Sequence, residues 1–339
     1  MSWRRILGHD HQVQAFAQAR RRGRLAHAYL FTGPPGIGKH LFAHELAKAV
    51  LCENPPPDCL EACDQCSSCV LVEAGTHPDY AHAQRPAESL DVPIDTIRAL
   101  CQTFSLKSAR GQGKVAILDD ADDLNVAAAN CFLKTLEEPP PRSVLILIGT
   151  SADLQLPTIV SRCQVIHFRP LPADLVAELL RRQDVTDDDL LQRLTRLSGG
   201  SPGQALALAD PALWDFRQKL IAGLTRPRPD ATALAHDFMK FVEEAGKESS
   251  AQRRRASLVL RLLIDFLRHA LALSVEGTPP VEPEEWESLA NLAHRLGPER
   301  LLDVLQRCLD ADMHIDRRVQ LVLAVEALVD NLGKVLARA

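Results

Sequence analysis

The chain has 339 residues, which is long for a single hydrophobic core and predicts two or three domains. Hydrophobic residues make up 46% of it and charged residues 24%, a balance that excludes an intrinsically disordered protein. The net charge of -5 excludes a globally basic surface for nucleic acid. No apolar run reaches the ~18 residues of a membrane span and no apolar signal segment opens the chain, so we expect a cytoplasmic protein.

The first half of the chain predicts strands that alternate with helices. One or two helices with a basic end come first, and apolar runs then indicate buried strands. The strands are expected at 28–32, 115–118, 144–148 and 165–168, and the helices at 1–24, 41–51, 93–104 and 127–138. This alternation predicts a parallel α/β sheet with both faces covered.

A glycine-rich loop, residues 33–40, joins the first strand to the next helix. Gly33, Gly36, Gly38 and Lys39 match a phosphate-binding loop, in which backbone N–H groups and the lysine bind nucleotide phosphates. The last position normally gives Mg²⁺ a hydroxyl, but here it is His40, and an imidazole does not replace a hard oxygen ligand. The loop therefore predicts a degenerate nucleotide site. Whether ATP and Mg²⁺ still bind is left open.

Five of the nine cysteines fall between residues 52 and 69. In a reducing compartment such a cluster favours metal binding over disulfides. Cys63, Cys66 and Cys69 have a spacing that predicts three thiolate ligands of one tetrahedral Zn²⁺. The fourth ligand is Cys52 or, alternatively, Cys59, and the lack of an open position predicts a structural zinc ion. An iron–sulfur cluster is the alternative that the cysteine count leaves open.

The second buried strand runs from a basic loop into a group of acids. The loop, residues 107–114, suits contact with DNA phosphates and simple solvation equally. Asp119 has the position of a Walker B aspartate, which helps to hold Mg²⁺. Asp120 follows where active ATPases of this kind have a glutamate, and a misplacement of about 1 Å can cost roughly a hundredfold in rate. For Asp122 and Asp123, the alternative to a role in the nucleotide site is that they cap the next helix.

From Pro170 onward the sequence predicts helices only. Residues 170–209 indicate three short helices, and residues 210–339 indicate a larger all-α domain. Its helices are expected at 231–246, 251–273, 284–296, 298–311 and 316–337. The α/β domain then spans residues 1–169, with the zinc-binding insertion at 52–69.

An ordered set of motifs resembles the clamp-loader branch of the AAA+ superfamily. The motifs are 25–36, Gly75 to Asp79, Asn130 to Pro140, Ser161-Arg162-Cys163 and Gly200 to Gly203. The resemblance extends over about residues 5–208. It implies an AAA+ domain, then a small helical lid at 170–209 and a collar at 210–339 that assembles a hetero-oligomer.

Within this family the resemblance favours the delta-prime branch of DNA polymerase III over the gamma/tau motor branch. The motor branch has a hydroxyl residue and a glutamate where this chain has His40 and Asp120, and Gln204 replaces an arginine that often contacts nucleotide. Asp79 after the His-Pro pair also suits delta-prime. The resemblance implies a stator that presents Arg162 to the ATP site of a neighbouring motor subunit. The implied partners are motor subunits, the delta subunit, the sliding clamp and, indirectly, primed DNA, with no membrane.

Two other functions are left open. One is an active ATPase, either a divergent gamma/tau-type motor or a separate P-loop enzyme. The other is a zinc-dependent nucleic-acid-binding protein with a degenerate P-loop, although the net charge of -5 argues against it.

Overall fold

The computed structural model describes residues 2–56, 59–89, 91–226, 228–275 and 283–337. The chain forms two compact units, Met1–Leu206 and Ala207–Ala339. The finer division into three domains, with a boundary at residue 170, stays a prediction. Within the described ranges, no helix has the length and apolarity that crossing a membrane requires.

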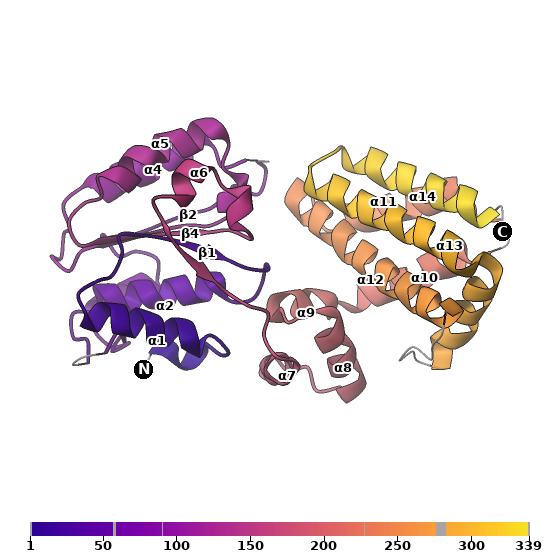
Figure 1. Cartoon of the computed structure of the whole chain (residues 1–339), viewed down its shortest axis with the longest axis horizontal. Coiled ribbons are helices and arrows are strands. Elements are labelled where there is room, and N and C mark those ends of the chain that lie inside the picture. Colours follow the sequence, from indigo (N-terminus) through magenta and orange to yellow (C-terminus); the bar gives the residue numbers. More distant parts are fainter. Residues whose placement is uncertain (1, 57–58, 90, 227, 276–282, 338–339) are drawn as a thin grey trace. The chain divides into compact units, whose positions relative to one another are not determined.

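A five-stranded parallel sheet forms the centre of the first unit (Figure 1). Across the sheet the strands are β2 (Tyr80–Ala83), β3 (Lys114–Leu118), β4 (Ser143–Ile148), β1 (Ala28–Thr32) and β5 (Gln164–His167). Every residue of β1, β3 and β4 is buried, which confirms the strands expected from the apolar runs. All strands run in the same direction, so their carboxyl ends lie at the same edge of the sheet.

Helices cover both faces of this sheet (Figure 1). One layer consists of α1 (Asp10–Arg21) and α2 (Lys39–Leu51), the other of α4 (Ile94–Ser105) and α5 (Val126–Glu137). Side chains alternate along the strands, so Phe31 joins the core under α1 and α2 while Leu30 joins the core under α4 and α5. The predicted two-sided parallel sheet is thereby confirmed.

Shorter elements complete the first unit. The three short helices expected after the sheet are present as α7 (Ala173–Arg181), α8 (Asp188–Leu197) and α9 (Pro202–Leu208), of which α9 extends past Leu206, the end of the first unit. The others are η1 (Ser2–Arg5), α3 (Ser67–Glu73), η2 (Ala121–Asp123), η3 (Ala152–Leu154) and α6 (Pro157–Val160).

The second unit is helical throughout its described residues, as the sequence predicted. Its helices are α10 (Pro211–Leu224), α11 (Ala231–Glu243), α12 (Ser249–Val275), α13 (Pro283–Asp316) and α14 (Leu321–Ala337). Phe216 stacks on Phe241 with ring centroids 4.4 Å apart, which joins α10 to α11. Gly297 interrupts α13 with a φ of 69°, so the break expected between two helices at this point is present.

Among the strands and α-helices, three elements were not predicted from the sequence. β2 is a short edge strand, and the run YAHA lacks the apolar pattern of a buried strand. α3 starts inside the cysteine segment, where the spacing of the cysteines predicted metal ligands and not a helix. α10 did have a sequence signal, because Asp210 caps it by accepting from the Ala212 amide and Pro211 fills its first position.

Candidate functional site

The glycine loop is closed by a turn that lies far away in sequence. Ser201 Oγ donates to the Pro35 carbonyl at 2.7 Å, and the Gly203 amide donates to the Gly36 carbonyl at 2.9 Å. Gly36 has a φ of 77°, and a Cβ at this position would lie 2.7 Å from Ser201 Oγ. A glycine is therefore required here for both conformation and space.

Lys39 points back into the same loop. Its Nζ donates to the carbonyls of Gly33 at 2.6 Å and Pro34 at 2.8 Å, and only 6% of the residue is exposed. Burial lowers the pKa of Lys39, against the opposing charges of Asp122 and Asp119. The lysine therefore helps to hold the loop that precedes it.

His40 and Asp119 lie together at the carboxyl edge of the sheet, as their motif positions predicted. His40 Nδ1 is 2.9 Å from Asp119 Oδ2. Burial disfavours the ionised form of Asp119, but the contact with His40 outweighs it and lowers the pKa of the carboxyl. Asp120, in contrast, has a left-handed φ of 53°, and burial together with Asp119 raises its pKa.

These groups do not fit a magnesium–nucleotide site. Mg²⁺ takes oxygen ligands in near-octahedral geometry, whereas His40 offers a nitrogen and already binds the carboxylate that would hold the ion. Gln204 stands where the related motor subunits often have an arginine. Its backbone amide donates to Ser201 Oγ at 3.2 Å, in the turn that closes the loop. The donor set thus supports the expectation of a degenerate site.

The acids after Asp120 have structural roles that the sequence did not indicate. Asp122 accepts from the Thr150 amide, the Thr150 hydroxyl and the Gln155 side chain, each at 2.7 Å. Asp123 forms an ion pair with Arg85 at 2.7 Å. The alternative that these acids cap the next helix is wrong, because Asn125 caps α5 by accepting from the Ala128 amide.

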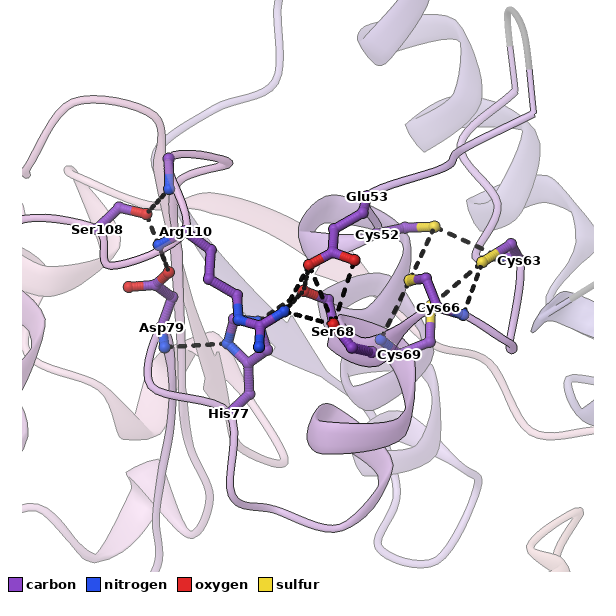
Figure 2. A network of polar contacts seen from close by, with 12 residues as sticks. Cys52, Glu53, Cys63, Cys66, Ser68, Cys69, His77, Asp79, Ser108 and Arg110 are labelled. Atoms are coloured by element: carbon purple, nitrogen blue, oxygen red, sulfur yellow. Dashed lines mark hydrogen bonds and ion pairs between the residues drawn. The ribbon is translucent and has the colours of Figure 1, made fainter.

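Four cysteines converge at the end of α2 (Figure 2). Cys52 follows the last turn of α2, Cys66 caps α3, and Cys69 lies in the first turn of α3. Together with Cys63 they place four Sγ atoms within 4.8 Å of one another. Cys59 is exposed and is not part of the group, so the structure favours Cys52 as the fourth member.

The sulfur geometry of this cluster is close to that of a tetrathiolate site. The pairs Cys52–Cys66 and Cys63–Cys69 have Sγ–Sγ distances of 4.0 Å. Zn–S bonds of about 2.3 Å imply sulfur–sulfur edges of about 3.8 Å, so the cluster fits Zn²⁺ after a small contraction. Backbone N–H groups donate to three sulfurs, and the amides of Gln65 and Cys66 lower the pKa of Cys63 to about 7, whereas burial raises the pKa of Cys52 and of Cys69. Such donors favour the thiolate form that a metal requires.

A chain of hydrogen bonds connects the cysteine segment to the sheet (Figure 2). The Asp79 amide donates to His77 Nδ1 at 3.0 Å, so His77 Nε2 carries the proton and donates to Ser68 Oγ at 3.0 Å. Ser68 Oγ in turn donates to Glu53 at 3.0 Å, and Arg110 binds the same carboxylate at 2.5 Å. These contacts give the His-Pro-Asp motif a structural role.

Asp79 also organises the basic loop 107–114. Its carboxylate accepts from Ser108 Oγ and from the amides of Ala109 and Arg110, at 2.7 to 3.0 Å. Lys114 is only 4% exposed and donates to the carbonyls of Thr103 and Leu106. Arg110 and Lys114 are therefore engaged within the chain, and these contacts hold the loop in place.

Arg162 lies directly after α6 and is held in place by an acid. Its guanidinium binds Glu137 Oε1 through Nη2 at 2.6 Å and Nε at 3.1 Å, and Nη1 donates to the Thr158 carbonyl at 3.0 Å. The side chain is 35% exposed. Sequence reasoning missed Glu137, which lies in the Asn130–Pro140 motif.

Buried histidines are expected to make the stability of the first unit sensitive to acid. His9 is 3% exposed, lies 2.8 Å from the Ile37 carbonyl, and has a pKa lowered by burial. The unfolded chain, with a histidine pKa of about 6.5, then binds more protons, so the free energy of unfolding falls as pH drops below that value. We expect His9→Gln, which keeps a donor for Ile37, to flatten this fall in urea titrations between pH 7.5 and 5.

His44 and His77 also have pKa values lowered by burial, so the flattening should be partial. A fall of equal steepness in the wild type and in His9→Gln would contradict the assignment of His9.

Comparison with known proteins gives consistent matches. A family model described as "DNA polymerase III, delta subunit" matches residues 8–172. The chain is 32% identical over 284 residues to DNA polymerase III subunit delta' of Escherichia coli (strain K12), covering 84% of this chain and 81% of that one. It is 36% identical over 217 residues to the Pseudomonas aeruginosa delta' subunit, covering 63% and 65%. The tau subunit of Bacillus subtilis is 30% identical over 213 residues, covering 61% and 37%. The matches therefore span less than two thirds of the last two relatives.

Proposed function

The chain belongs to the delta' family of DNA polymerase III clamp-loader subunits, and from this premise we propose that it acts as a stator and not as a motor. In this role it assembles with motor subunits and the delta subunit, and it helps them to load the sliding clamp on primed DNA. It contributes a side chain to a neighbour's ATP site and hydrolyses no ATP itself.

The observation that carries the proposal is the contrast between the glycine loop and Arg162. In the loop, Lys39 is bound to the backbone carbonyls of the loop itself and His40 is bound to Asp119, so both side chains already have partners within the chain. Arg162 is partly exposed and oriented by Glu137. An arginine displayed in this way suits action on a phosphate supplied by another subunit.

We further propose that Cys52, Cys63, Cys66 and Cys69 hold a structural Zn²⁺. The support is the convergence of four sulfurs, with a spacing close to a tetrahedron. The ion would fix the segment between α2 and α3, which the Glu53–Ser68–His77 contacts then connect to the sheet.

The second unit supports assembly with other subunits. Leu302, Leu309 and Met313 are 55%, 48% and 40% exposed, and their spacing of seven and four residues places them on one face of α13. A row of exposed apolar side chains on a helix is typical of a protein–protein interface. The proposed role of this unit is that of the collar.

The test is ATP turnover by a complex reconstituted with this chain. Under the proposal, Lys39→Ala in this chain changes turnover by less than about twofold, because its loop performs no hydrolysis, whereas Arg162→Ala slows turnover. Circular dichroism and thermal unfolding control for the loss of the Lys39 hydrogen bonds.

A large loss of turnover with a correctly folded Lys39→Ala chain would overturn the stator role. So would Lys39-dependent ATP hydrolysis by the purified chain alone.

A further inference from the structure

Two histidines and an aspartate from three different elements meet beside the glycine loop. His40 comes from the first turn of α2, His82 from β2, and Asp119 from the end of β3. One ligand atom from each side chain can be chosen such that all three lie within 4.8 Å of one another. This cluster is separate from the four cysteines, which lie at the other end of α2.

The sheet register explains why these side chains meet. His82 pairs with Ile117 in the β2–β3 ladder, and the Asp119 amide donates to the Ala83 carbonyl at 2.8 Å just beyond it. Since side chains alternate along a strand, His82, Ile117 and Asp119 point to the same face. That face is the one covered by α2, because Ile117 belongs to the core that contains Phe42.

The distances are compatible with ligands of a single ion. His40 Nδ1 and Asp119 Oδ2 are 2.9 Å apart, and the rings of His40 and His82 have centroids 4.9 Å apart in an edge-to-face arrangement. Ligands that bind a metal at about 2.1 Å lie roughly 3 to 3.5 Å from one another. One nitrogen of His82 lies within 4.8 Å of a ligand atom of each of the other two side chains, so a bound ion would draw this ring closer.

We propose that His40, His82 and Asp119 form a binding site for a divalent first-row transition metal ion such as Zn²⁺, with the remaining coordination positions open to water. Two imidazoles and one carboxylate are the donors that such ions prefer, whereas Mg²⁺ prefers oxygen alone. His40, which makes the loop unsuitable for Mg²⁺, thus supplies a nitrogen ligand for a different ion. The bound ion joins the start of α2 to β2 and β3.

His44 lies one turn further along α2 and is not part of this set. Its ring nitrogens face the Tyr80 hydroxyl at 3.4 Å and Glu73 Oε2 at 3.3 Å. Both contacts direct the ring toward β2 and α3, away from Asp119. The proposed ligands are therefore limited to one histidine of α2.

The experiment measures zinc bound per chain by equilibrium dialysis at rising free Zn²⁺, together with the ring nitrogen NMR signals of the histidines. Four chains are compared: the wild type, His82→Ala, His40→Ser and the control His236→Ala, whose exposed histidine lies on α11. We expect the wild type and the control to bind one zinc more than the two variants, whose affinity for that ion falls by roughly tenfold or more. The signals of His40 and His82 should shift with it.

Zinc that remains bound at the cysteine cluster indicates that a variant is folded. The comparison of zinc content between the four chains does not depend on clamp-loader activity. Three results would overturn the proposal. They are equal zinc content in all four chains, retention of the additional zinc ion by His82→Ala when His40→Ser has lost it, and displacement of this zinc ion by millimolar Mg²⁺.

Discussion

Replacement of Cys69 by serine is expected to have the largest effect on stability. Cys69 is 1% exposed, and its Sγ lies 4.0 Å from that of Cys63. A serine removes one of four thiolates from the proposed zinc site and leaves a polar hydroxyl in its buried place. Because zinc binding by small cysteine sites contributes on the order of 10 kcal/mol at neutral pH, its loss should lower the unfolding free energy by several kcal/mol.

The measurements are zinc content per chain and urea unfolding, with and without a chelator. Cys59→Ser is the matched control, since Cys59 belongs to the same segment but is exposed and lies outside the cluster. Chelation should destabilise the wild type and the control alike and should leave Cys69→Ser unchanged. If Cys59→Ser and Cys69→Ser lose the same amount of zinc, the assignment of the fourth ligand is wrong.

Arg162→Ala is expected to have the largest effect on the proposed function. A positively charged group aimed at the transferring phosphoryl group stabilises the charge that develops in the transition state, and its removal should slow the site it serves by roughly a hundredfold or more. The chain itself should stay folded, because Arg162 is partly exposed and its ion pair with Glu137 lies at the surface. The measurement is single-turnover ATP hydrolysis by the reconstituted complex.

Two further variants separate a role in catalysis from a role in structure. Glu137→Gln removes the charge that orients Arg162 but keeps the arginine, so it should cost less than Arg162→Ala. Arg182→Ala removes an exposed arginine that binds Glu178 on α7 and should leave turnover unchanged. Equal turnover for Arg162→Ala and the wild type would refute the proposed action in trans.

The α/β fold was predictable because its signals are local. Buried strands such as β1 and β4 are continuous apolar runs, and the glycines of the loop mark the turn from strand to helix. β2 was not predicted because it lies at the edge of the sheet and contains a histidine, so it lacks a continuous apolar run. Its position depends on pairing with β3. The start of α10, in contrast, is encoded locally, because Asp210 caps the helix.

The sequence by itself determined the family, the two-sided parallel sheet, the candidate Arg162 and three members of the cysteine cluster, since each depends on residue type and short spacing. Only the tertiary structure separated Cys52 from the alternative Cys59, joined Arg162 to Glu137, and brought His82 to His40 and Asp119. Those contacts form between elements whose order in the sheet differs from their order in the chain. Sheet register and helix packing decide them, and no spacing along the sequence encodes such distances.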